Sequence, residues 1–319
     1  MLLIDGLECS NYNREIFREL HDAKVSAVTI TAAFWEDALE TMDELGRWND
    51  RARNNADLIT IARTAEDIES AAAGGRTAVI LGVQNSTPLN DRLRFVELFH
   101  RMGLRVMQLT YNNQNAVGGS CYEPEDSGLT RFGREVVHEM NRVGMLVDLS
   151  HVGNRTSLEA IHASESPVAI THANPASLVE HPRNKPDDVL KALADAGGVL
   201  GLATYNNIAG DYATSPQAWA DMVARTVDLI GIDHVGIGTD LGQNSGDGDL
   251  DWMRRGRWTR DAQPGAALSN VPEQDWFRSP THFEAITSAL RDHGRFEEKD
   301  IDAILGGNWM RLYRGVFKP

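Results

Sequence analysis

The amino-acid sequence predicts a (β/α)8 barrel, and three observations lead to that fold. The chain has 319 residues, an ordinary length for this barrel. Short, nearly continuous apolar runs recur along it, and longer segments with helical periodicity lie between them. Such runs are typical of strands that are buried on both faces of a parallel sheet. Regular alternation of these strands with helices favours a closed barrel over an open sheet.

Eight apolar runs are predicted to form the barrel strands. They cover residues 2–6, 25–31, 77–83, 106–111, 145–151, 168–173, 199–204 and 234–240. Helical periodicity is readable over residues 92–102, 131–143, 156–164, 187–196 and 217–230. Glycines just past several of these segments favour helix C-caps there: Gly103, Gly144, Gly197 and Gly231.

Residues 243–280 fit no strand–helix unit and are rich in Gly, Asp, Arg and Trp. Because they follow the eighth run, we expect an excursion over the carboxyl ends of the strands. It could serve as a lid, as a contact in a homodimer, or as a solvated segment with a few buried tryptophans. No composition shift suggests a boundary, so residues 1–319 are predicted to form one domain with this excursion.

Charge and composition exclude several function classes. The chain carries 46 acidic and 31 basic residues, a formal net charge of −15, which argues against nucleic acid or an anionic membrane as a partner. The two cysteines, Cys9 and Cys121, cannot build a disulfide framework. No stretch approaches the ~20 apolar residues of a membrane span, and we expect no signal peptide and a cytoplasmic location.

Polar residues end three of the predicted strands. His151 and His172 close the fifth and sixth, and Asp240 closes the eighth. In this fold the chemistry lies at the carboxyl ends of the strands, where the loops converge. Neutral imidazoles suit Zn2+, and a nearby carboxylate can bind metal or move protons. A single strand-end histidine is more often a packing residue, but two of them with an aspartate favour a site.

Two loops near these strand ends carry candidate substrate contacts. Arg183 lies in a proline-stiffened loop, residues 181–188, where its guanidinium could hold a substrate carboxylate with two hydrogen bonds. The alternative is a motif that only pins the loop. Tyr111 and Asn112, in the amide-rich segment 108–115, could orient a polar substrate, although asparagine-rich loops also simply suit turns.

Five motifs in this order resemble those of the membrane dipeptidases, peptidase family M19 of the amidohydrolase superfamily. They are Val-Asp-Leu-Ser-His151, Thr-His172-Ala-Asn-Pro, His-Pro-Arg183-Asn-Lys-Pro-Asp-Asp, Val-Gly-Ile-Gly-Thr-Asp240 and Gly-Gly-Asn-Trp309. The resemblance spans nearly the whole chain and implies a barrel of the metal-dependent hydrolase type that cleaves dipeptides with two zinc ions. It implies that His151 and His172 bind the second metal, that Arg183 binds the substrate carboxylate, and that Asp240 is the acid/base.

The first metal site departs from the family pattern. The family's His-x-Asp pair on the first strand reads Leu7 and Cys9 here, and Gln84 stands where a glutamate normally bridges both metals. Tyr111 replaces a histidine on the fourth strand. Leucine cannot ligate a metal, and a thiol is a soft substitute for a carboxylate. A standard two-metal centre is therefore not expected.

Three hypotheses remain. The first is a hydrolase with one Zn2+ held by His151 and His172, with Gln84 and Cys9 as lesser candidate ligands, acting on a small amide that carries a carboxylate. The second is a metal-free, non-hydrolytic enzyme on the same barrel. The third is a catalytically silent relative that binds a small ligand. We prefer the first, because one zinc can activate water and because His151, His172, Arg183 and Asp240 are all present.

Overall fold

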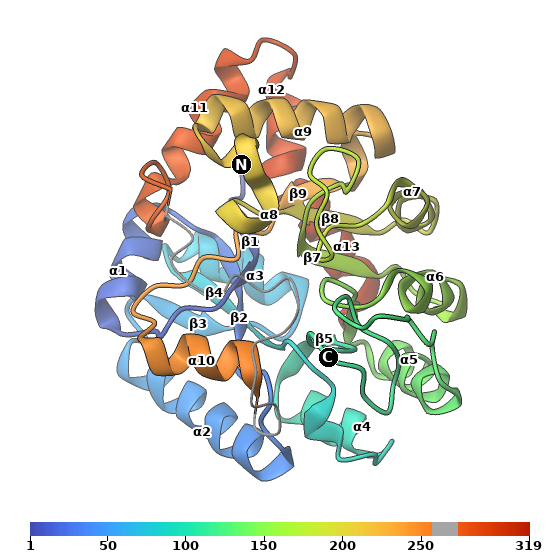
Figure 1. Ribbon diagram of the computed structural model, residues 1–319. Helices are drawn as coiled ribbons and strands as arrows, with labels where there is room; N and C mark the ends of the chain where they lie inside the picture. Colours follow the sequence, from blue (N-terminus) through green and yellow to red (C-terminus); the bar gives the residue numbers. More distant parts are fainter. Residues whose placement is uncertain (257–273) are drawn as a thin grey trace.

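The computed structural model describes residues 1–256 and 274–319. Parallel strands at the centre close into a (β/α)8 barrel with helices around them, as predicted (Figure 1). The nine-stranded sheet runs in the order β2-β1-β9-β8-β7-β6-β5-β4-β3, and pairing of β2 with β4 completes the ring.

Eight of the strands form the ring, and each overlaps one of the eight predicted runs. They are β1 (Ile4–Glu8), β2 (Ala27–Thr31), β4 (Thr77–Val83), β5 (Leu104–Gln108), β6 (Leu146–Asp148), β7 (Ala169–Ala173), β8 (Val199–Leu202) and β9 (Val235–Ile237). The ninth, β3 (Ile59–Ile61), pairs with the first half of β4 and was not predicted. Three residues are too few to show a strand period.

Helices connect the strands. The larger ones are α1 (Arg14–Asp22), α2 (Ala38–Asn54), α3 (Ala65–Ala73), α4 (Phe95–Arg101), α5 (Arg131–Val143), α6 (Asn154–Ala163), α7 (Asp187–Asp195), α9 (Pro216–Ile230), α11 (Phe283–Asp292) and α13 (Asn308–Val316). The five predicted helical segments correspond to α4, α5, α6, α7 and α9. The sequence reading missed α2, whose buried side chains are sparse over its 17 residues: Ala38, Thr41, Leu45 and Trp48. So thin an apolar stripe gives a weak helical period.

The other described elements are shorter, except for α10 with its nine residues. They are η1 (Thr87–Leu89), α8 (Asn206–Ala209), η2 (Gly210–Ala213), η3 (Ile232–His234), α10 (Asp247–Arg255), η4 (Pro280–His282), α12 (Glu298–Asp302) and η5 (Ala303–Gly307). The glycines predicted to end helices all have left-handed or otherwise positive φ, from 77° at Gly197 to 107° at Gly103. Side chains would strain the backbone there.

A tryptophan from the C-terminal helix fills the barrel interior below the strand ends. Trp309 is fully buried, and its Nε1 donates to the carbonyl oxygen of Ile237 at 2.9 Å. A Cβ added at Gly6, Gly201 or Gly236 would press against the Trp309 ring, so these strands need glycine at those points. The Gly-Gly-Asn-Trp motif therefore has a packing role.

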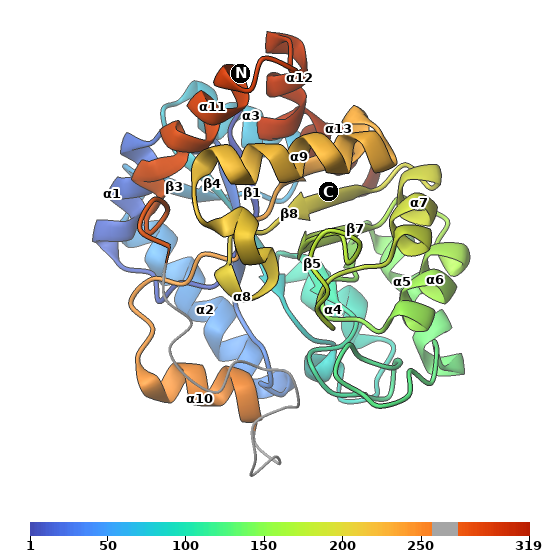
Figure 2. The same ribbon diagram turned by 45° about the horizontal axis from the view of Figure 1, so that its top comes forward.

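Helix α10 lies within the predicted excursion, beside α2 in both views (Figures 1 and 2). Trp252 Nε1 donates to Glu36 at 2.8 Å, and Trp35 Nε1 donates to the carbonyl oxygen of Met253 at 3.3 Å. These bonds hold α10 against the segment that connects β2 with α2. Residues 257–273 of the excursion lie outside the described residues, so its role as a lid or subunit contact stays a prediction. None of the described helices is both long and apolar enough to span a membrane.

Candidate metal site at the barrel mouth

Two imidazoles meet at the ends of neighbouring strands. His172 lies in β7, and His151 follows the end of β6. Their Nε2 atoms face each other at 3.1 Å, and both side chains are buried. The convergence that was predicted for this pair from the assumed barrel is therefore present.

Hydrogen bonds at the opposite ring nitrogens fix which nitrogen of each imidazole carries the proton. His151 Nδ1 lies 2.7 Å from the amide oxygen of Asn112, which only accepts, so Nδ1 is the donor. His172 Nδ1 lies 2.8 Å from Thr171 Oγ1. That hydroxyl donates its one proton to Asp148 Oδ2 at 2.7 Å, so it accepts from His172. Both Nε2 atoms are then left with a lone pair.

These facing lone pairs suit a cation. Burial lowers the pKa of both His151 and His172 well below the ordinary histidine value, and the charge of Arg183 adds to that effect. The two rings are therefore neutral at physiological pH, and their Nε2 lone pairs repel each other. Two bonds of about 2.0–2.1 Å to one Zn2+ can span the 3.1 Å separation. The donor chemistry of the pair fits a metal ion.

Two buried basic side chains hold the main chain around these histidines. Arg183 donates to the carbonyl oxygens of Ser150 at 2.5 Å and of His172 at 3.2 Å. Lys185, fully buried, donates to the carbonyl oxygen of Val152, and burial is the main cause that lowers its pKa to about 7. Hydrogen bonds to charged groups are each worth about 1.5–3 kcal/mol. Arg183 lies at the mouth, as predicted. Its contact with a substrate stays a prediction, and it would use the N–H groups that are not bonded to these carbonyl oxygens.

Asp240 follows β9 in a left-handed backbone conformation, φ 60°. Non-glycine residues in this region often lie at functional sites, although aspartate tolerates it better than most. Burial raises the pKa of its carboxyl to about 6, against the opposing charge of Arg183. A group with that pKa exchanges its proton near neutral pH, as the predicted acid/base role requires.

The half of the mouth formed by β1 and β4 does not fit a metal. Leu7 is buried, and Gln84 uses its amide nitrogen to donate to Thr31 Oγ1 at 2.9 Å. Cys9 Sγ lies 3.8 Å from Asp240 Oδ1. Burial, followed by the charge of Asp240, raises the pKa of the Cys9 thiol well above its ordinary value, so the thiol stays neutral. This half therefore offers no anionic ligand from the predicted residues.

Glu8 is a buried carboxyl beside Cys9 that sequence reasoning did not single out. Tyr12 donates to its Oε2 at 2.9 Å, and its Oε1 has no hydrogen-bond partner among the described residues. Burial, together with the nearby Asp5, raises its pKa well above the ordinary value. In the metal-free protein these surroundings favour the neutral form of Glu8.

An aromatic wall lines the mouth next to His151. The Tyr111 ring lies 4.2 Å from the His151 ring, centroid to centroid, and Phe34 and Trp35 pack against Tyr111 at 5.2 and 5.3 Å. Asn112, the other predicted substrate contact, turns its amide oxygen to His151 and has φ 57°. The structure thus gives Asn112 a bond to a histidine, and contact of either residue with substrate stays a prediction.

Within residues 1–256 and 274–319, no three His, Cys, Asp or Glu side chains converge as a ready metal-binding group. A metal on the histidine pair would therefore take its remaining ligands from water or substrate, and would have one protein ligand fewer than catalytic zinc usually has.

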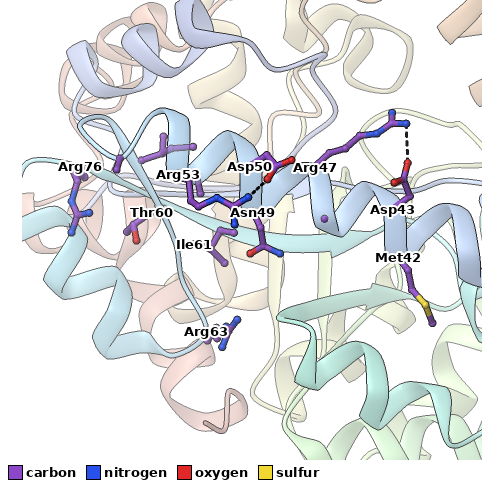
Figure 3. Close-up of a pocket in the computed structure, with 14 residues that line it drawn as sticks. Met42, Asp43, Arg47, Asn49, Asp50, Arg53, Thr60, Ile61, Arg63 and Arg76 are labelled. Atoms are coloured by element: carbon purple, nitrogen blue, oxygen red, sulfur yellow. Dashed lines mark hydrogen bonds and ion pairs between the residues drawn. The ribbon is translucent and has the colours of Figure 1, made fainter.

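Two hollows on the surface involve α2. A groove of about 810 Å³ is lined by α2, β3 and the arginines Arg63 and Arg76, and it holds none of the predicted site residues (Figure 3). A cleft of about 420 Å³ between α2 and α10 has Cys9 in its wall. Only the second hollow adjoins the barrel mouth.

Comparison with known proteins identifies the family. The model of the membrane dipeptidases, peptidase family M19, matches residues 7–251. The chain belongs to this family. Among related proteins, dipeptidase verJ of Clonostachys rogersoniana is 33% identical over 258 residues, which are 75% of this chain and 66% of that protein. The uncharacterized dipeptidase C965.12 of Schizosaccharomyces pombe is 34% identical over 213 residues, 64% of this chain and 50% of that protein.

Solved structures of similar proteins share the barrel of this membrane dipeptidase family member. An amidohydrolase from Pseudomonas aeruginosa is 34% identical with a TM-score of 0.95, covering 99% of this chain and 96% of that one. A metallopeptidase from Rhodobacter sphaeroides, bound to a phosphinate mimic of L-Ala-D-Ala, is 18% identical with a TM-score of 0.79, covering 99% of both chains, which shows a shared fold. This chain spans about half to two thirds of the length of the two dipeptidases named above, 50% and 66%.

Sequence reasoning missed three residues around the histidines. Asp148, Thr171 and Lys185 all lie inside the motifs that carried the resemblance, yet none was given a role. One signal was available: a polar residue inside a strand that is otherwise buried and apolar, as Asp148 and Thr171 are.

Proposed function

We propose that this protein is a metal-dependent hydrolase that cleaves a dipeptide or a similar small amide bearing a carboxylate, with one metal ion held by His151 and His172. The observation that carries the proposal is the pair of neutral imidazoles whose Nε2 atoms face each other at 3.1 Å. Membership of the membrane dipeptidase family supports the hydrolytic chemistry. A zinc ion bound there would lower the pKa of a bound water to about 7 and polarise the scissile carbonyl.

The residues of this chain would divide the remaining work. Asp240, with a pKa near 6, would take a proton from the attacking water and return it to the leaving amine. Arg183 would bind the substrate carboxylate with the N–H groups that Ser150 and His172 leave available. Tyr111, with Phe34 and Trp35 behind it, would exclude water from one side of the bound substrate.

The test is a zinc titration of the metal-free protein, with elemental analysis, followed by a screen of dipeptides and N-acyl amino acids. We expect about one zinc per chain, lost in His151→Ala, and hydrolysis that a chelator abolishes. Hydrolysis that survives both the chelator and His151→Ala would contradict the proposal. An uptake of two zinc ions would contradict its single-metal part and leave the hydrolase intact.

A further inference from the structure

Asp148 touches neither of the proposed metal-binding nitrogens, yet its carboxylate collects four hydrogen bonds directly below them. Ser150 N donates to Oδ1 at 3.1 Å and Ser150 Oγ at 2.6 Å, while Thr171 N donates to Oδ1 at 2.9 Å. Thr171 Oγ1 donates to Oδ2 at 2.7 Å. The side chain is 1% exposed, so no bulk water competes for these contacts.

This arrangement links Asp148 to the orientation of His172. The Thr171 hydroxyl has one proton, and Asp148 takes it. Its lone pair then accepts from His172 Nδ1 at 2.8 Å. Ser150 Oγ, which also donates to Asp148, accepts from the backbone N–H of His172 at 3.1 Å. The carboxylate of Asp148 thus positions the ring of His172 through the Thr171 hydroxyl, and its main chain through the Ser150 hydroxyl.

From these contacts we infer that Asp148 and Thr171 are positioning residues, which hold His172 in the tautomer that leaves Nε2 free to bind the metal. The inference rests on the proposed function, because it assigns these residues a role toward a metal on the histidine pair. Metal-bound histidines usually donate their second N–H to an oxygen that fixes the ring, and loss of that partner typically weakens metal binding about 10- to 100-fold. In this chain the oxygen belongs to a threonine whose own proton is committed to a buried aspartate.

The chain offers a matched control on the other side of the barrel. Asp5 accepts from Thr239 N at 2.9 Å and from Thr239 Oγ1, in the same pattern as Asp148 and Thr171. The Thr239 hydroxyl, however, accepts from the backbone N–H of Leu241 at 3.2 Å, and no imidazole bonds to it among the described residues. Thr239→Val therefore removes an equivalent hydroxyl from the barrel without touching a histidine.

The experiment measures zinc affinity by competition with a chromophoric chelator, and the absorption spectrum of the Co2+-substituted protein. We expect Thr171→Val to bind zinc about 10- to 100-fold more weakly and to change the Co2+ spectrum. Thr171→Ser, which keeps the hydroxyl, should restore both, and Thr239→Val should bind zinc as the wild type does. Equal affinity and identical spectra in Thr171→Val and the wild type would overturn the inference.

A second measurement covers the case in which Thr171→Val does not fold. Histidine-selective 15N NMR of the metal-free wild-type protein should show His172 protonated at Nδ1, and a proton on Nε2 instead would also overturn the inference. Failure of the proposed function looks different, because the wild type itself would then bind no zinc and the assignment of Asp148 and Thr171 would be lost with it.

Discussion

The β6/β7 side and the β1/β9 side of the barrel mouth are built on the same hydrogen-bond pattern. In each, an aspartate on one strand accepts from the backbone N–H and the hydroxyl of a threonine in or just after the neighbouring strand, Asp148 with Thr171 and Asp5 with Thr239. Each aspartate also accepts from the backbone N–H two residues further along the chain, that of Ser150 at 3.1 Å or of Leu7 at 3.3 Å.

The two sides differ in what the pattern supports. On the β6/β7 side, the residues at the mouth next to this pattern are two neutral imidazoles that face each other. On the β1/β9 side, they are Leu7, Cys9 with its neutral thiol, and Asp240. The same hydrogen-bond framework therefore lies below the mouth on both sides, while only the β6/β7 side carries the two facing imidazoles that we propose to bind the metal. The side chains at the mouth differ although the hydrogen bonds beneath them are alike.

Loss of a histidine tests the metal-binding side and should have the largest effect. His172→Ala removes one of two facing Nε2 donors, so zinc affinity should fall by more than the roughly 100-fold that loss of an outer-shell partner can cause. Competition titration measures the affinity. His138→Ala, on the exposed face of α5, is the control and should bind zinc normally. Unchanged zinc binding in His172→Ala would remove the distinction between the two sides.

Rebuilding the ligands of the β1/β4 half tests whether side chains alone separate it from the β6/β7 half. The combined variant Leu7→His, Cys9→Asp, Gln84→Glu introduces one imidazole and two carboxylates, ligands that suit zinc. Because the hydrogen-bond framework is already present, we expect the zinc content to rise from about one to about two ions per chain by elemental analysis. A variant that folds, as judged by circular dichroism, but still binds one zinc would show that side chains alone do not separate the two halves, and that the backbone of the β1/β4 half is also unsuited to a metal.

Through Asp5, the β1/β9 side should also make the stability of the fold depend on pH. Burial raises the pKa of Asp5 to about 7, whereas its ordinary value is 3.8. The folded chain thus keeps a proton that the unfolded chain releases above pH 4, so Asp5 makes the fold less stable as pH rises from 4 to 7. This loss of unfolding free energy is on the order of 2–4 kcal/mol between pH 4 and 7, and Asp5→Asn should remove it. Urea unfolding at several pH values measures the change.

The exposed Asp22→Asn is the control for this experiment and should keep the wild-type pH profile. A profile of Asp5→Asn parallel to that of the wild type would mean that Asp5 is ionised in the folded protein.

The smallest effect is expected for Cys9. Its thiol is neutral and touches Asp240 only weakly, at 3.8 Å. Cys9→Ala should therefore change zinc affinity and turnover by less than about threefold, below 1 kcal/mol. A loss of tenfold or more in zinc affinity would show that the thiol is a ligand, and the β1/β9 side would then share in metal binding.

The sequence by itself determined the barrel and the strand ends at which His151, His172 and Asp240 lie. Eight apolar runs gave the eight ring strands because a strand buried on both faces must be apolar along its length. His151, His172 and Asp240 followed from their position at strand ends, and the changes at Leu7, Cys9 and Gln84 were visible in the motif that should carry ligands. Elements with few buried side chains or very few residues, such as α2 and β3, were not predicted.

Only the tertiary structure decided how the histidines are held. Asp148 and Thr171 are 23 residues apart, and their hydrogen bond exists because β6 and β7 are neighbours in the ring. The same holds for the bonds from Arg183 to the carbonyl oxygens of Ser150 and His172, which no spacing in the sequence indicates. Periodicity reports which face of an element is buried, whereas hydrogen-bond partners and tautomers depend on atoms that long-range folding brings together.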